Sequence, residues 1–295
     1  MSRGVGVTEL LTELPTAVLV CFAVLTQLGD FWFVATASLL AYWLGSTTPW
    51  LGRGLTRERG AVLVGLVAAA AAVSLGLKAV FAFPRPSNAA VVSATAGLPW
   101  PVAPFYESVV SGRGYGFPSG HATSAVLSWG GFAWALRVGR RRQRYAVAAA
   151  AVAVISLSRL VLGVHYLVDV VAGAAIAAAV LWLALTRLRT PARLFAFVTV
   201  VGAIGVVAGG LTRDTAGAVG LGVGGLAAWS VLGSVPEPTR RGGVATAILG
   251  ALWLAAVAAA VLVGPPDPVV GLLTAVGTAG ALSLPLVGER VAKKA

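Results

Sequence analysis

Apolar stretches long enough to cross a membrane recur along this chain, and they constrain its fold more than any other feature. Hydrophobic residues make up 58% of the 295 residues, and charged residues only 11%. A soluble domain carries about a quarter charged residues, and a disordered chain has far less apolar surface. The composition therefore excludes both classes and predicts an all-α, polytopic transmembrane helix bundle.

A helix needs about 20 mainly apolar residues to cross the hydrocarbon core, and this length divides the sequence into ten predicted spans. They cover residues 12–28, 31–49, 61–79, 119–137, 145–159, 166–186, 194–211, 216–234, 244–263 and 269–287. Only a Gln-Leu-Gly-Asp stretch separates the first two spans. A single kinked span at that point would invert the topology downstream.

The basic residues support this division. The chain has 22 Lys and Arg against 10 Asp and Glu, a net charge of +12. In a soluble protein this excess would suggest nucleic acid as a partner, but arginines in cytoplasmic loops explain it in a membrane protein, so no nucleic-acid partner is expected. With both termini in the cytoplasm, 17 basic residues fall on the cytoplasmic side. The outer side receives five: Lys78, Arg85, Arg113, Arg159 and Arg213.

The first of three polar clusters on the outer side contains two of these cations. Lys78 ends the third predicted span, and Arg85 follows in a Pro-rich segment, residues 80–118, that cannot form a continuous helix. The pair could simply anchor a helix end at the interface. The positive-inside rule disfavours cations on this side, which favours a functional role.

The second cluster, Ser119-Gly120-His121, begins the fourth predicted span. Ser119 after a proline is ordinary helix capping. Capping does not explain His121, however. The backbone N–H groups at such a helix start can hold an anion, and the histidine can exchange a proton with it.

The third cluster combines Arg159 with His165 and Asp169. The last two are four residues apart, so on a helix they share one face. A carboxylate that accepts from one ring nitrogen fixes the tautomer and leaves the other nitrogen as a nucleophile or base. A buried His–Asp pair serving only packing is the alternative.

Together the clusters place three cations, a helix N-terminus and both histidines of the chain on one side. This set fits a phosphoryl group, because phosphoryl transfer needs positive charge and N–H donors around the oxygens. The outer acids are scattered along the chain, so neither a metal site nor a cofactor is expected.

The three clusters resemble a known signature. Lys-x6-Arg-Pro at 78–86, Pro-Ser-Gly-His at 118–121 and Ser-Arg-x5-His-x3-Asp at 158–169 look like the three-part motif of the type 2 phosphatidic acid phosphatase superfamily. The resemblance covers residues 1–190 as a six-span phosphatase core. It implies that His165 attacks phosphorus and forms a phosphohistidine, that Asp169 orients it, and that His121 protonates the leaving oxygen and then activates water. By the same resemblance the phosphate oxygens would be held by Lys78, Arg85, Arg159, Ser119 and Gly120.

Residues 191–295 form about four further predicted spans outside the resemblance. They are either a lipid-facing bundle for stability or homo-oligomerisation, or a lateral wall for a bulky lipid or a partner.

Aromatic residues flank the predicted site and suit an amphipathic substrate: Phe81, Phe83, Trp100, Phe105, Tyr106, Tyr115 and Phe117. The expected activity is hydrolysis of a lipid phosphate or an isoprenoid diphosphate, with the membrane lipid and the bilayer as partners. A phosphotransferase with an acceptor other than water, and a phosphate-lipid transporter or flippase, are the alternatives. The preference for Arg, Ala, Val and Gly suggests a GC-rich prokaryotic genome, hence a prokaryotic cell membrane with the site on its outer face.

Overall fold

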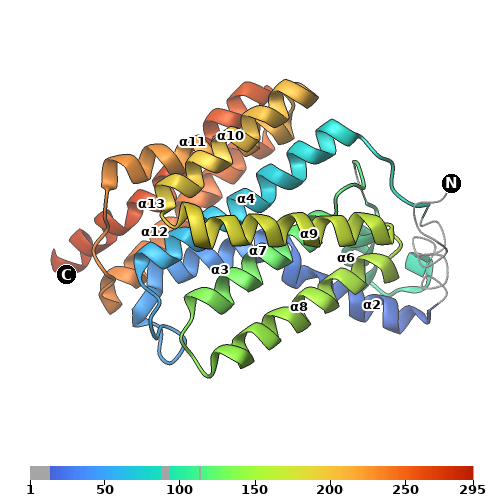
Figure 1. Ribbon diagram of the computed structural model, residues 1–295, viewed down its shortest axis with the longest axis horizontal. Helices are drawn as coiled ribbons and strands as arrows, with labels where there is room; N and C mark the ends of the chain where they lie inside the picture. Colours follow the sequence, from blue (N-terminus) through green and yellow to red (C-terminus); the bar gives the residue numbers. More distant parts are fainter. Residues whose placement is uncertain (1–13, 88–93, 113, 295) are drawn as a thin grey trace.

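A computed structural model describes residues 14–87, 94–112 and 114–294, which form a bundle of helices lying roughly along one axis (Figure 1). Within these ranges no β-strand occurs, and each of the ten predicted spans contains one helix. The helices of those spans are α2 (Thr16–Leu25), α3 (Phe31–Leu44), α4 (Arg57–Phe81), α7 (Gly120–Ala135), α8 (Arg141–Val161), α9 (Leu167–Leu183), α10 (Pro191–Gly209), α11 (Arg213–Leu232), α12 (Arg240–Leu262) and α13 (Asp267–Lys294). In this part of the chain seven helices are long and apolar enough to cross a membrane. The all-α, polytopic bundle is thus confirmed.

Helix α4 lies at the centre of the bundle. The most apolar part of α4 is 78% buried, because α3, α7, α10 and α11 all pack against it. The side chain of Thr56 accepts a hydrogen bond from the backbone N–H of Arg59 and caps the helix start. At the other end Ala82 adopts a left-handed conformation with φ of 48°, one turn after Lys78. Helix α4 therefore places Lys78 at the end of the bundle where the Pro-rich segment begins.

The N-terminal part differs from the expected pair of spans. Residues 16–29 and 31–47 are bent by only 42° relative to each other, so they continue in one direction as a broken span. Asp30 sits at the break and caps α3 by accepting from the N–H of Trp32. With the bent pair counted as one span, the described part of the segment expected as a six-span core contains four candidate membrane spans, this pair, α4, α8 and α9, together with the shorter α7 of 16 residues.

One broken span in place of two spans alters the expected topology only at the N-terminal end. Helix α2 begins at the end of the bundle where α4 ends, whereas α13 ends at the opposite end (Figure 1). The described starts of α4, α8 and α12 still carry the predicted arginine clusters at one common end. The expectation that both termini share one side depended on two spans before α4. With one broken span there, the start of α2 and the end of α13 lie at opposite ends of the bundle. Arg3 and Arg113 lie outside the described residues.

The described residues of the Pro-rich segment form no continuous helix, as expected. Its described residues include a short 3-10 turn (Ala94–Gly97) and α6 (Val102–Val110). Tyr106 and Val110 of α6 are fully buried and pack with Leu19 of α2 and Val164. Helix α6 thereby supports the backbone immediately before His165.

The four C-terminal helices are not a separate unit beside the core. Helix α10 packs against α4 and α11, α11 against α13 and α4, and α12 against α13 and α3. Small residues permit close approach: a Cβ at Gly224 of α11 would lie 2.1 Å from the carbonyl oxygen of Ala275 in α13. The C-terminal helices therefore cover two helices of the predicted phosphatase core.

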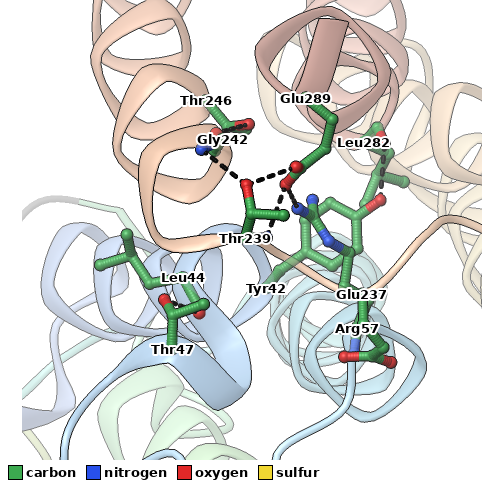
Figure 2. Close-up of polar contacts among 10 residues, drawn as sticks. All are labelled: Tyr42, Leu44, Thr47, Arg57, Glu237, Thr239, Gly242, Thr246, Leu282 and Glu289. Carbon is green, nitrogen blue, oxygen red and sulfur yellow. Dashed lines mark hydrogen bonds and ion pairs between the residues drawn. The ribbon is translucent and has the colours of Figure 1, made fainter. Parts of the chain in front are cut away.

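A buried ion pair joins the two parts at the end remote from Lys78 (Figure 2). Arg57 is 1% exposed and its Nη2 donates to Oε1 of Glu289 at 2.7 Å. Glu289 also accepts from the N–H of Thr239 at 3.1 Å and from its hydroxyl at 2.7 Å. Nearby, the Tyr42 hydroxyl donates to the carbonyl oxygen of Leu282 at 2.6 Å. Arg57, one of the 17 basic residues expected on the cytoplasmic side, thus holds α13 and the start of α12 against α4.

Candidate active site

His165 and Asp169 lie together, as their spacing predicted. His165 precedes α9, and its Nδ1 lies 3.6 Å from Oδ2 of Asp169 in the first turn of that helix. Its Nε2 lies 3.1 Å from Nη1 of Arg85. A guanidinium only donates, so Nε2 must be the acceptor, and the ring proton of the neutral imidazole sits on Nδ1 facing Asp169. The nitrogen with the available lone pair is therefore Nε2.

Asp169 is fixed by its own helix and by α7. Its Oδ2 accepts from the N–H of Tyr166 at 3.0 Å, and its backbone oxygen accepts from the N–H of Ser119 at 2.9 Å. A Cβ at Gly173, one turn further along α9, would lie 2.9 Å from the carbonyl oxygen of Ser119, so the two helix starts pack closely. The second and third sequence clusters thereby form one site.

The surroundings of His165 keep its imidazole neutral. Burial lowers the pKa of His165 well below its usual value, and the charges of Arg159, Arg85 and Lys78 lower it further. Because its pKa is lowered, the imidazole stays neutral even when the pH falls below about 6.5, the usual pKa of histidine. At neutral pH Nε2 therefore keeps its lone pair. A neutral, oriented imidazole is the form that a nucleophilic histidine requires.

His121 has a carboxylate partner that sequence analysis missed. Its Nε2 lies 3.5 Å from Oδ2 of Asp30, the residue at the break between α2 and α3. No local spacing in the sequence connects Asp30 to His121, so this contact could not be predicted. The site therefore contains two His–Asp pairs, one at the start of α9 and one at the start of α7.

The three predicted cations converge on the same end of the bundle. Arg85 also donates to the carbonyl oxygen of Val164 at 2.9 Å, which holds it beside His165. Arg159 is 4% exposed, and its Nη1 donates to the Thr26 hydroxyl at 2.9 Å. Its Nε has no hydrogen-bond partner among the described residues. The charges of Lys78, Arg85 and Arg159 all act on His165.

Ser119 and Gly120 occupy the expected helix start, and the Ser119 side chain is in the capping position. Ser119 is fully buried, and its hydroxyl accepts from the N–H of Ala122 at 3.5 Å as the cap of α7. A Cβ at Gly120 would lie 3.7 Å from the Lys78 ammonium and 3.0 Å from the Ser74 hydroxyl. The glycine thus lets Lys78 approach the α7 backbone, and Ser74 is a further polar neighbour that sequence analysis missed.

A polar cavity of 620 Å³ lies at this end of the bundle, and His165, Asp169, Lys78, Ser119 and Gly120 are not part of its wall. Its lining includes Arg85, Arg159, His121 and Asp30. Guanidinium forks match the oxygens of a phosphate, and a histidine supplies or accepts a proton. The cavity therefore has the chemistry to hold a phosphoryl group next to His121. His165 is buried and reaches the cavity wall only through its contact with Arg85.

The aromatic residues divide into a packed cluster, a set of exposed rings and one buried ring. Phe81, Phe83 and Phe117 form a cluster with ring centroids 5.1 to 5.7 Å apart. Trp100 is 84% exposed, and Phe105 and Tyr115 are also exposed, as an interfacial position requires. Tyr106, by contrast, is completely buried under the His165 segment and is not available to a substrate.

No group of three His, Cys, Asp or Glu side chains suited to a metal ion occurs in the described ranges. The donors gathered at the site are cations, imidazoles and backbone N–H groups, which bind anions.

Comparison with known proteins supports the resemblance seen in the motifs. Residues 59–193 match the model of the PAP2 superfamily, a range that includes every predicted site residue. No curated protein and no solved structure matches the chain. The match indicates phosphatase-type hydrolase activity on phosphate esters. One residue of each motif, namely Arg85, His121 and Arg159, lines the polar cavity. By the match to the family model, residues 59–193 of this chain belong to the PAP2 superfamily, the type 2 phosphatidic acid phosphatases.

Proposed function

We propose that this protein is a membrane phosphatase that hydrolyses a lipid phosphate monoester or an isoprenoid diphosphate through a phosphohistidine at His165. The observation that carries the proposal is the orientation of His165, whose Nε2 faces Arg85 while Asp169 lies at Nδ1. A phosphate oxygen is a stronger acceptor for a guanidinium than a neutral imidazole is. An approaching phosphate therefore takes over the Arg85 donor and exposes Nε2 for attack.

In the first step the lone pair of Nε2 forms a bond to phosphorus while the bond from phosphorus to the leaving oxygen breaks. Asp169 stabilises the positive charge that develops on the imidazole, as the acid of a catalytic triad does. Arg85, Arg159 and Lys78 stabilise the charge on the equatorial oxygens. His121 gives its proton to the leaving oxygen, and Asp30 stabilises the imidazolium form needed for that donation.

In the second step water attacks the phosphohistidine and His121, now neutral, accepts the proton of the water. The bond between phosphorus and Nε2 breaks, and its electron pair returns to the imidazole of His165. The products are inorganic phosphate and the dephosphorylated lipid. His121 thus acts as acid and then as base, which regenerates both histidines.

The charge distribution supports an outward-facing site. Arginine-rich helix ends lie opposite the polar cavity, and the positive-inside rule places such ends in the cytoplasm. The exposed aromatic residues near the cavity suit a headgroup-level position on the outer face of a prokaryotic cell membrane. A lipid phosphate could then enter with its headgroup in water and its tail in the bilayer.

A phosphate-release screen over lipid mono- and diphosphates tests the proposal. We expect purified protein to release inorganic phosphate from phosphatidate, phosphatidylglycerophosphate or a polyprenyl diphosphate in mixed micelles, and vanadate to inhibit it. Release only from water-soluble sugar phosphates would contradict a lipid substrate. Loss of substrate phosphate without free phosphate, matched by a phosphorylated acceptor, would instead identify a phosphotransferase. Lipid movement that survives His165→Ala would identify a transporter.

The pairing of Asp30 with His121 gives a sharper prediction. Asp30→Asn keeps a capping side chain for α3 but removes the charge beside His121. We expect kcat/KM for an alkyl phosphate ester to fall about 10- to 100-fold, within the range attributed to general acid–base catalysis. A nitrophenyl phosphate with a hydrocarbon substituent needs no proton on its leaving group, so its first step should change little.

Glu107→Gln is the matched control, because Glu107 is an exposed acid on α6 at the same end of the bundle. It should leave both substrates unaffected. If Asp30→Asn lowers kcat/KM equally for the alkyl and the nitrophenyl ester, Asp30 has a structural role and does not position His121 as the acid.

A further inference from the structure

A second cavity reaches from the catalytic residues into the C-terminal helices. It measures 430 Å³, and Lys78, Gly120 and His121 form part of its wall. The opposite wall comes from α11 and α13, outside the range matched by the PAP2 model. The C-terminal helices are thus part of the immediate surroundings of the predicted site.

The walls of this cavity change from polar to apolar along the helix axes. On α4 the lining residues Lys78, Leu75 and Ala71 are spaced by three and four residues, so they share one face. On α11 the corresponding series begins with Asp214 and continues to Gly217 and Leu221. Charges therefore lie at the catalytic end, and small or apolar side chains line the rest.

A third cavity lies next to the second one, further from the catalytic end. It measures 480 Å³ and shares Phe31 and Leu221 with the second cavity. Val64 of α4 lies in its wall, together with residues of α3, α12 and α13. From Lys78 to Val64 the path through the two cavities follows α4 for about 21 Å, at about 1.5 Å per residue. One leaflet of the hydrocarbon core is roughly 15 Å deep, so this path can take the whole length of a lipid tail.

We propose that these two cavities form one tail pocket, in which α11 and α13 hold the hydrocarbon chain of the substrate during hydrolysis. The inference rests on the proposed function and assigns the C-terminal helices a role in selecting long-chain substrates. It adds a binding surface that the three motifs do not contain.

The position of His121 favours a hydrocarbon chain as the occupant. His121 and Asp30 line both the polar cavity with Arg85 and Arg159 and the first section of the tail pocket. The oxygen that leaves phosphorus joins the released phosphate to the rest of the lipid, through glycerol in phosphatidate and through a second phosphate in a polyprenyl diphosphate. A general acid at the boundary between an anion site and an apolar pocket is therefore next to that oxygen.

Gly217→Leu tests the pocket by filling it. A Cβ at Gly217 would have the Thr274 hydroxyl 3.9 Å away as its nearest neighbour, and Gly217 lines the cavity, so the added side chain has room to enter it. Ala227→Leu is the matched control, because Ala227 is an exposed residue on the same helix. The substrates are dioleoyl and dihexanoyl phosphatidate and long- and short-chain polyprenyl diphosphates, each at a fixed mole fraction in mixed micelles.

We expect Gly217→Leu to lower kcat/KM about tenfold for the long-chain substrates, mainly by raising KM, which corresponds to about 1.4 kcal/mol. The short-chain substrates and the Ala227→Leu protein should stay within about twofold of wild type. The lipid class that shows the loss identifies whether acyl or isoprenoid chains use the pocket. Equal effects on long and short chains, or no effect, would overturn the proposal.

A binding measurement separates this proposal from the proposed function. Phosphatidate and polyprenyl phosphate probes with a photoreactive group in the tail are cross-linked to His165→Ala protein, which needs no turnover. We expect labelled peptides from α11 and α13, and less labelling after Gly217→Leu. Such labelling in a protein that hydrolyses no lipid would refute the phosphatase proposal and keep the pocket. Labelling confined to exposed faces such as α12, unchanged by Gly217→Leu, would refute the pocket alone.

Discussion

Replacing His165 with alanine should abolish phosphate release. The substitution removes the attacking Nε2 and the group through which Asp169 acts, so we expect kcat to fall by about 10³-fold or more, as for other lost nucleophiles. Phosphate release from the lipid substrate that wild type hydrolyses fastest, measured in mixed micelles, checks this expectation.

His165→Asn serves as the matched control for folding. Asparagine keeps a polar side chain between Arg85 and Asp169 but has no nucleophilic nitrogen, so it should be as inactive as alanine. Both variants should elute as wild type does in size-exclusion chromatography. Substantial activity in either folded variant would exclude His165 as the nucleophile.

Glu289→Ala should produce the largest loss of stability among the substitutions considered. Arg57 is 1% exposed, and Glu289 is the acid that its guanidinium contacts at 2.7 Å. Removing the acid leaves the buried guanidinium without a carboxylate in contact, because Glu237 accepts only from the backbone N–H of Arg57. Loss of one partner costs about 3–5 kcal/mol for buried pairs. Denaturant titration in detergent micelles, followed by tryptophan fluorescence, would give the change in the free energy of unfolding.

Two further variants show whether loss of the ion pair causes the destabilisation of Glu289→Ala. Arg290→Ala removes an exposed charge on the next residue and should change the free energy of unfolding by less than about 0.5 kcal/mol. The double variant Arg57→Met/Glu289→Leu should recover most of the loss, because it removes both charges and fills the space with apolar groups. A double variant as unstable as Glu289→Ala would contradict the buried-charge explanation.

Contacts set by local spacing were predictable from the sequence. His165 and Asp169 share a helix start, so their spacing already implied proximity. Ser119 was recognised as a possible cap, and the structure shows its hydroxyl in that position. Apolar length likewise located a helix in each of the ten predicted spans.

Contacts that depend on packing between distant segments were not predictable. Asp30 meets His121 only because the break before α3 lies against the start of α7. Arg57 and Glu289 are 232 residues apart, and nothing in the local pattern of either residue indicates the other. The bend of 42° between residues 16–29 and 31–47 has the same origin, because apolar composition fits one broken span as well as two short ones. A hydropathy pattern shows where a segment is apolar and how long that segment is. It does not show whether the chain reverses direction between two such segments.

Direct detection of the phosphoenzyme tests the central claim. The chain has only two histidines, so His121→Ala leaves His165 as the only histidine that can be phosphorylated. Because His121 is the proposed base of the second step, this variant should accumulate the intermediate when given the nitrophenyl phosphate that needs no acid. We predict an acid-labile, base-stable phosphoryl group that mass spectrometry maps to His165. Continued phosphate release by His121→Ala without any labelled histidine, or a label on another residue, would contradict the phosphohistidine mechanism.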